Sequence, residues 1–316
     1  MNVGENYNND TEKDTHFNMH GIKVISKLYD KNARGSGKSP LVLLHGYAIG
    51  SLFFYRNLLG LSSHHFNGVV YALDMLGWGL SSRPRFELKE KGQGLDGEVD
   101  MTEQFFVESL EAWRKAHNLD KMTLCGHSMG GYFSIAYAEK YPKHVDSLIL
   151  LSPVGVPHEK KELFDEKGIP WSHNLILKSG KFLWNRGITP SKFVRSLPEA
   201  QGRNLVGNQI ERKFPDISLE ERKFLIDYSY TNFALPASGE DCLNKVFKPF
   251  AYAKRPTISR IPYLKVKNVT FIYGENDWMD YTGGLDVHRT CQQLKEAGKN
   301  DVPRTKVLTV KDAGEC

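Results

Sequence analysis

The chain has 316 residues, of which 40% are hydrophobic and 25% charged, a composition typical of a globular protein with a full apolar core. Its 42 basic and 37 acidic residues leave a net charge of +5. That excess is too small to predict a nucleic-acid partner, although it would favour an anionic lipid surface. Four cysteines are scattered without CxxC or zinc-type spacing, so we expect free thiols in a reducing, intracellular environment and no metal site.

The amino-terminal residues are polar and carry no targeting pattern. Residues 1–14 are rich in Asn, Asp and Glu and contain no arginine, which fits neither a secretory signal nor an amphipathic transit peptide. We expect residues 1–20 to form a disordered tail. No apolar run approaches the roughly 18 residues that a membrane-spanning helix needs, so any membrane contact is expected to be peripheral.

Short apolar runs alternate with helical patterns along much of the chain. Residues 102–117 have apolar side chains at helical spacing behind Thr102, a candidate N-cap, and a second helix should follow residue 128 and end at Lys140. Runs that are apolar throughout are typical of parallel strands buried on both faces, so an α/β fold with a mostly parallel sheet is predicted. The expected strands are residues 41–44, 69–73, 122–125, 147–151, 269–273 and 306–310.

The alternation stops between residues 153 and 267, where helical patterns and prolines occur without a convincing strand. We therefore expect a core made of residues 21–152 and 268–316 and a helical cap made of residues 153–267. Ligands of open α/β sheets bind beyond the carboxyl ends of the strands, so a cap inserted there would roof the site.

A G-x-S-x-G motif places Ser128 between a predicted strand and a predicted helix. This is the context of a nucleophile elbow, in which small neighbours allow the strand and helix to approach closely. The helix behind Ser128 would direct amide donors and a positive dipole at an oxyanion. A serine in an ordinary strand–helix turn is the less favoured interpretation.

The turn after the first predicted strand reads His45-Gly46-Tyr47. In folds with this elbow, that turn supplies the second donor of the oxyanion hole. The amides of Tyr47 and Met129 are therefore the candidate donors. We expect His45 to order the turn rather than to carry a proton.

The acid of a serine site is expected after the strand at 269–273, because the order in this fold is Ser, then acid, then His. Asp277 occupies that place, and Asp280 is close enough to substitute for it. A solvated loop position is as plausible as a catalytic one for Asp280, and less so for Asp277.

The general base should follow the last predicted strand within a few residues, because a serine hydroxyl is a poor nucleophile without one. The chain there reads Lys-Asp-Ala-Gly-Glu-Cys, and Glu315 would be a weak base. His288 falls within a predicted helix, and the His127 side chain is expected to face away from Ser128.

Four segments together resemble the lysophospholipid branch of α/β-hydrolase-domain proteins. This branch includes the lipid-droplet lipase co-activator, the N-acyl phospholipid lysophospholipase, fungal lysophosphatidate acyltransferases and a fungal cardiolipin-specific deacylase. The likeness extends from about residue 41 to residue 314. The segments that carry it are residues 41–46, 71–86, 104–109 and 126–131.

The resemblance implies an α/β-hydrolase fold and serine-dependent hydrolysis or transfer of phospholipid or lysophospholipid acyl groups, without a cofactor. It implies a cytoplasmic protein or one peripheral on a mitochondrial or lipid-droplet membrane. In that family a pair of histidines and an aspartate follow Asp-Ala-Gly, whereas Glu315 and Cys316 follow residues 312–314 here. We therefore expect a fold truncated after its last strand and an impaired enzyme. The alternative is a catalytically inactive lipid- or protein-binding relative.

Residues 175–184 combine apolar bulk with Lys178 and Lys181. Such a helix would suit a membrane surface. The preferred interpretation is a cap helix packed on the core.

Overall fold

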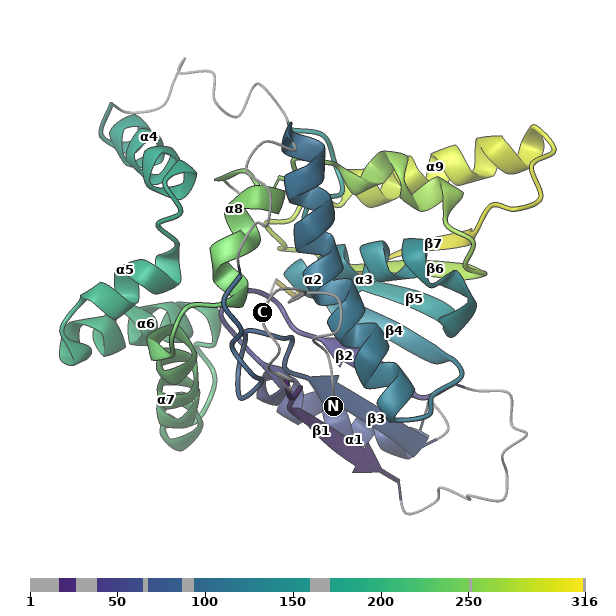
Figure 1. The fold of residues 1–316 in the computed structure, drawn as a ribbon. Helices are drawn as coiled ribbons and strands as arrows, with labels where there is room; N and C mark the ends of the chain where they lie inside the picture. Colours follow the sequence, from purple (N-terminus) through teal and green to yellow (C-terminus); the bar gives the residue numbers. More distant parts are fainter. Residues whose placement is uncertain are drawn as a thin grey trace, which may run out of the picture.

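The computed structural model describes residues 17–26, 39–64, 68–86, 94–159, 171–249 and 252–314. Within them the chain forms one seven-stranded sheet in the order β1-β3-β2-β4-β5-β6-β7 (Figure 1). Every neighbouring pair is parallel except β1 and β3. The strands are β1 Gly21–Ile25, β2 Leu41–Leu44, β3 Val69–Leu73, β4 Met122–His127, β5 Val145–Leu151, β6 Asn268–Gly274 and β7 Arg304–Val310.

The six strands expected from apolar runs are all present, which confirms the mostly parallel sheet. Strand β1 was not predicted, because its sequence alternates between exposed and half-buried positions instead of forming an apolar run. It lies at the sheet edge, antiparallel to β3, where one face and one edge remain open. An edge strand needs less apolar sequence than a central strand, so composition gives little sign of it.

Residues 17–20, which we expected to belong to a disordered tail, are bound to the turn after β3. The His20 amide donates to Ser81 Oγ at 2.8 Å, and the His20 ring contacts Asp74 Oδ2 at 2.7 Å. The remainder of the expected tail, residues 1–16, lies outside the described residues.

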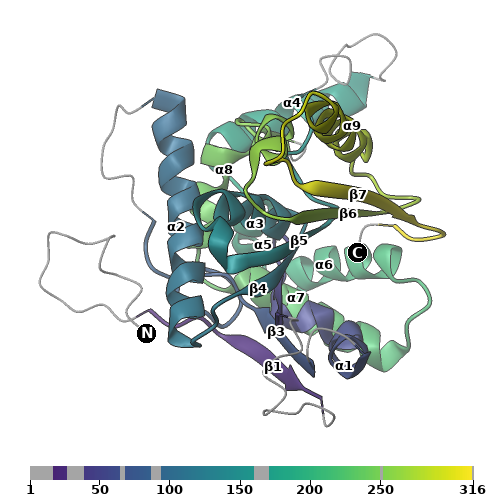
Figure 2. The same ribbon diagram turned by 90° about the vertical axis from the view of Figure 1, so that its right-hand side faces the viewer.

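One face of the sheet is covered by three long helices, α2 Gly94–Ala116, α3 Met129–Lys140 and α9 Thr282–Glu296 (Figure 2). Helix α2 begins before the expected N-cap, because Thr102 lies inside it and donates its hydroxyl to the Glu98 carbonyl. The core on this face is strongly aromatic. Its largest buried side chains are Trp113, Tyr132, Phe133, Tyr137, Phe271 and Tyr273.

The opposite face is covered by helix α1, Tyr55–His64, which contacts β1 and β3. The apolar cluster on this face is smaller, and in it Leu41, Leu43 and Val70 of the strands pack with Phe54 and Leu58. Toward the other edge of this face, Ile149, Leu151, Ile272 and Leu308 are only half-buried. The expectation that the strands are buried on both faces therefore holds for β2 and β3, and fails for β6, whose burial alternates.

The chain between β5 and β6 is helical in its described residues and lies to one side of the sheet (Figure 1). Helix α5 begins with a proline, and the Thr189 hydroxyl caps its first turn. The Ser218 hydroxyl likewise caps the first turn of α7. The helices of this cap are α4 Trp171–Asn185, α5 Pro190–Ser196, α6 Glu199–Lys213, α7 Leu219–Ala234 and α8 Leu243–Val246.

Polar contacts attach the cap to the core at several separate places. Arg56 of α1 binds Glu221 of α7 through two nitrogens, at 2.7 and 2.5 Å. Lys245 of α8 binds Glu98 of α2 at 3.1 Å. Among the described residues no helix is both long and apolar enough to cross a membrane.

A buried carboxylate, Glu103 of α2, connects the helical face to the chain entering β6. It accepts the Tyr132 hydroxyl at 2.6 Å, two nitrogens of Arg260 at 2.7 and 3.0 Å, and Arg255 at 2.7 Å. Arg260 also binds Glu139 of α3, whose side chain is 47% exposed. The same guanidinium therefore has one buried and one solvated partner.

Replacing Glu103 with glutamine should lower the free energy of unfolding by about 3 kcal/mol, because the largely buried Arg260 and the half-buried Arg255 lose their compensating charge. The matched change Glu139→Gln should cost less than about 1 kcal/mol, since that pair is half in solvent. Urea unfolding of both variants measures the difference. Equal losses would contradict the assignment of Glu103 as the buried anchor.

Candidate functional site

Ser128 occupies a strained turn between β4 and α3, with φ +52° and ψ −116°. The strand and helix approach so closely that only glycine fits on either side. A Cβ at Gly130 would lie 2.5 Å from the Leu44 carbonyl oxygen, and one at Gly126 would lie 2.3 Å from the Gly130 carbonyl oxygen. The turn thus has the geometry of a nucleophile elbow, which the sequence motif predicted.

Backbone hydrogen bonds fix this turn on the sheet. The Ser128 amide donates to the Leu151 carbonyl of β5 at 2.9 Å. The Ser128 carbonyl accepts from Gly131, the next turn of α3, at 3.0 Å and from Val154 at 3.3 Å. The position of the serine is therefore set by β4, β5 and α3 together.

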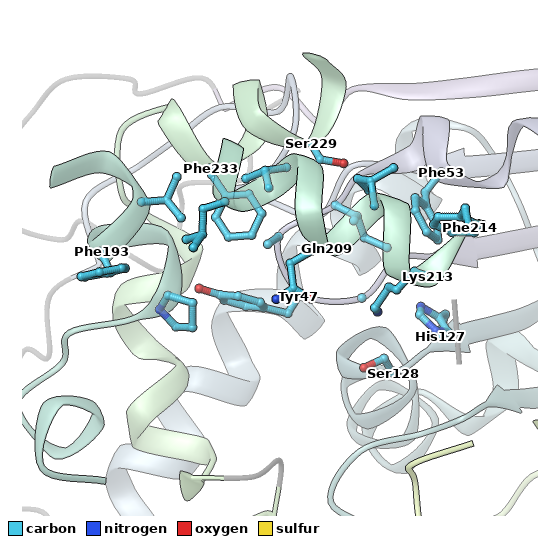
Figure 3. Close-up of a pocket in the computed structure, with 18 of the residues that line it drawn as sticks. Tyr47, Phe53, His127, Ser128, Phe193, Gln209, Lys213, Phe214, Ser229 and Phe233 are labelled. Carbon is cyan, nitrogen blue, oxygen red and sulfur yellow. The ribbon is translucent and has the colours of Figure 1, made fainter. Parts of the chain in front are cut away.

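Ser128 opens on a cavity of about 450 Å³ between the carboxyl ends of the strands and the cap (Figure 3). The lining is mostly apolar and comes from α5, α6, α7 and the loops after β2 and β6. Phe193 and Leu205, at the cap end of this cavity, are also 50% and 41% exposed, so the cavity reaches the surface there. The principal lining residues are Tyr47, Ile49, Phe53, His127, Ser128, Phe193, Val194, Leu205, Gln209, Ile210, Lys213, Phe214, Phe233 and Trp278.

A second cavity of about 210 Å³ meets the first at Ser128, Tyr47, Pro190 and Trp278. It extends toward α8 and ends near Phe247. The serine thus lies at the junction of a larger and a smaller apolar space. No sequence motif marks the cap residues that line these cavities, because an apolar side chain on a cap helix cannot be distinguished by pattern from a core residue.

His45 is fully buried and bridges two backbone groups. Its Nε2 accepts the Met75 amide at 3.0 Å, which leaves Nδ1 to donate to the Gly46 carbonyl at 2.7 Å. Burial lowers the pKa of His45, although the Asp74 carboxylate acts in the opposite direction. A neutral ring with both nitrogens used is a structural element of this turn, as the sequence suggested.

The Tyr47 side chain connects the same turn to the cap. Its hydroxyl lies 2.8 Å from Ser191 Oγ and accepts the Ser191 amide at 3.0 Å. Burial raises the pKa of Tyr47 to about 12, so it stays a neutral hydroxyl. Nothing in the sequence paired Tyr47 with Ser191, because the two are far apart along the chain.

The backbone amides of Tyr47 and Met129 have no hydrogen-bond acceptor among the described residues. Met129 is itself buried, at the first position of α3. A buried amide without an acceptor is costly, and such amides next to a nucleophile are the donors an oxyanion would use.

Asp277 lies in the loop after β6 and is held by three donors. The Ser152 hydroxyl donates to its carboxylate, as do the amides of Met279 at 2.8 Å and Gly274 at 3.4 Å. Asp280 instead accepts the Thr282 amide at 3.0 Å at the start of α9. Of the two candidate acids, Asp277 is the one connected to Ser152, which follows the last residue of β5. That last residue, Leu151, accepts the Ser128 amide.

The end of the described chain approaches this acid loop. The Asn276 amide donates to the Ala313 carbonyl at 2.8 Å, and a Cβ at Gly274 would lie 2.4 Å from the same oxygen. Residue 315 therefore follows directly from a segment bound to the acid loop. Glu315 and Cys316 themselves lie outside the described residues.

His127 lines the same cavity as Ser128, whereas the sequence suggested that its side chain would face away from the serine (Figure 3). The tight elbow accounts for this, because a Cβ at Gly46 would approach both the His127 ring and the Ser128 Cβ. Burial, with the positive charge of Lys213, lowers the pKa of His127 to about 4. The ring is neutral near pH 7.

Four other described histidines have bonds away from the cavity. His288, the candidate in the predicted helix, contacts Thr305 Oγ1 of β7 at 2.7 Å and thereby packs α9 on the sheet. The remaining contacts are His20 with Asp74, His117 with the Trp113 carbonyl and His144 with the Asp120 carbonyl.

Comparison with known proteins agrees with this geometry. A family model described as the alpha/beta hydrolase fold matches residues 39–315. A 1-acylglycerol-3-phosphate O-acyltransferase of Arabidopsis thaliana is 38% identical over 81% of this chain and 59% of its own length. The 1-acylglycerol-3-phosphate O-acyltransferase ABHD5 of Mus musculus is 34% identical over 85% of this chain and 71% of its own. The chain thus spans about three fifths of the plant relative.

Among solved structures, a membrane phospholipase A described as a bacterial virulence factor superposes with a TM-score of 0.58. The match covers 95% of this chain and 80% of that one at 17% sequence identity. At this identity the likeness shows the fold alone, and it confirms the α/β-hydrolase architecture.

The low pKa of His127 predicts a specific loss of stability in acid. The unfolded chain binds a proton on this ring near pH 6.5, and the folded chain only near pH 4. Acidification through this window therefore favours unfolding, and from pH 7 to pH 5 the contribution is about 2 kcal/mol. Between pH 7 and pH 5 the wild type should therefore lose more stability than the variant His127→Gln, and the difference should equal about that contribution. Urea unfolding at each pH measures it.

The control is His158→Gln, which changes an exposed histidine and should retain the wild-type pH dependence. If His127→Gln also follows the wild-type curve, the ring is not held neutral by burial.

Proposed function

Because the chain belongs to the lysophospholipid branch of α/β-hydrolase-domain proteins, we propose that it acts on lysophospholipid or phospholipid acyl esters by serine-dependent hydrolysis or acyl transfer. The observation that carries the proposal is Ser128, held in an elbow at the junction of two apolar cavities. A cavity of about 450 Å³ is suited to an acyl chain, since burial of its methylenes supplies the binding energy. The name of the relatives supports a phosphate-bearing glycerolipid as the substrate class.

In the proposed reaction, Ser128 Oγ attacks the ester carbonyl carbon and a base accepts the hydroxyl proton. The amides of Tyr47 and Met129 donate to the resulting oxyanion. Collapse of the tetrahedral intermediate breaks the bond to the glycerol oxygen, which takes the proton back. Water or the hydroxyl of a lysophospholipid then attacks the acyl-serine and gives up its proton to the base; the bond to Ser128 Oγ breaks, the serine takes that proton, and the acyl group leaves on the acceptor.

Asp277 is the proposed acid that orients the base. In the family that base is a histidine after the Asp-Ala-Gly segment, and residues 313–314 do approach the Asp277 loop here. Glu315 takes the place of the first histidine. A carboxylate is a weak base for a serine, so we propose slow turnover for the chain with this sequence.

Helix α4 is the proposed contact with a lipid surface. From residue 178 to residue 186 only Trp184 is partly buried, and Phe182 and Leu183 are 54% and 39% exposed. The residue that follows the helix, Arg186, lies over the Phe182 ring at 4.2 Å. Exposed apolar side chains beside basic ones suit a peripheral interfacial helix better than a helix packed on the core.

Ser128 should react with a fluorophosphonate probe, because the elbow and the oxyanion donors activate it even when the base is weak. Ser128→Ala should abolish the labelling seen by in-gel fluorescence. Ser134→Ala, a matched change in a buried serine of α3 outside both cavities, should leave it intact. Equal signals from wild type and Ser128→Ala would favour the alternative of an inactive lipid- or protein-binding relative.

The double variant Phe182→Ser, Leu183→Ser should bind vesicles that contain anionic phospholipid about tenfold less tightly, because two apolar side chains no longer enter the interface. Leu219→Ser is the matched control, since Leu219 is 82% exposed but lies on α7. Cosedimentation with vesicles measures both. Unchanged binding of the double variant would exclude α4 as the contact.

A further inference from the structure

The larger cavity has one charged residue among its lining residues, Lys213 at the end of α6, whose side chain is also exposed to solvent. The rest of the lining is apolar or neutral, since the low pKa of His127 keeps that ring uncharged. An isolated positive charge at an apolar cavity is a feature that binding of an acyl chain does not explain.

Lys213 has no carboxylate partner among the described residues, unlike Lys192 and Lys248 of the cap region. Lys248, which lines the smaller cavity, binds Glu159 at 2.7 Å, and Lys192 binds Asp241 at 2.8 Å. The structure therefore neutralises the lysine of one cavity and leaves the lysine of the other available for an anion.

The Lys213 side chain comes from the part of α6 that faces His127 and Ser128 (Figure 3). Lys213, His127 and Ser128 line the same cavity. An anion bound by Lys213 would thus lie close to an ester carbonyl at Ser128.

We propose that Lys213 binds the phosphate of an anionic lysophospholipid and makes the chain prefer phosphate-bearing over uncharged glycerolipids, an inference that rests on the proposed acyl chemistry for the choice of ligand. In such a lipid only the glycerol carbons separate the acyl ester from the phosphate. The acyl chain occupies the apolar lining while the phosphate meets the ammonium group. A lysine suits this role because its flexible stem carries a compact charge to a phosphate oxygen.

The test measures binding rather than turnover, in the Ser128→Ala background so that no substrate is consumed. Oleoyl lysophosphatidate and monooleoylglycerol share one acyl chain and differ in the phosphate. Lys213→Gln should weaken binding of lysophosphatidate about tenfold or more and leave monooleoylglycerol unchanged. Lys213→Arg should retain most of the affinity, and Lys213→Glu should lose more than the glutamine variant.

Lys223→Gln is the matched control, because it removes the same charge from an exposed lysine on the neighbouring helix α7, outside the cavity lining. It should leave both affinities unchanged. Inorganic phosphate at millimolar concentration should not displace lysophosphatidate, since the apolar lining contributes much of the binding. Displacement would assign the site to free phosphate and overturn the lipid assignment.

Unchanged lysophosphatidate binding by Lys213→Gln, or an equal loss for both lipids, would also overturn the inference. These outcomes are separable from failure of the proposed function. Absence of Ser128 labelling together with Lys213-dependent discrimination would indicate a lipid-binding relative, and labelling without discrimination would retain the enzyme and reject the phosphate site.

Discussion

The close approach of β2, β4 and α3 around Ser128 is the constraint on which the site depends. Gly126 and Gly130 leave no room for a side chain, and the serine backbone is held at positive φ by bonds to β5. Such strain persists only where the surroundings over-determine it. The aromatic core formed by α2, α3 and β6 provides that support, and buried Glu103 connects it to the chain that enters β6.

The close packing around Ser128 also determines which side chains line the cavity and their protonation states. It directs His127 into the space beside Ser128 and excludes water from the ring, so that a histidine next to the nucleophile is neutral and weakly basic. It also brings the turn after β2 against the elbow, where the Tyr47 hydroxyl connects to Ser191 of the cap. A movement of α5 would therefore be transmitted to the amide of Tyr47, which couples the cap to the proposed oxyanion donors.

The sequence predicted the features that depend on local pattern. The apolar strands and the elbow at Ser128 each have a periodicity or motif that is visible without the structure. Features that depend on tertiary contact were missed or misplaced. Strand β1 is defined by its partner β3, α2 starts before Thr102, and Lys213 is one lysine among many until α6 brings it to the cavity.

Tertiary contacts limit which histidines could act as a base for Ser128. His45 uses both ring nitrogens on backbone groups, and His288 holds α9 to β7, so neither is available to Ser128. Among the described residues, His127 is the one histidine at the cavity, and burial makes it a poor proton acceptor. Of the described residues near the end of the chain, Ala313 and Gly314 lie against the loop that carries Asp277. If the base is the residue that follows Gly314, it is Glu315 in this sequence, and proton transfer would limit the proposed chemistry at Ser128.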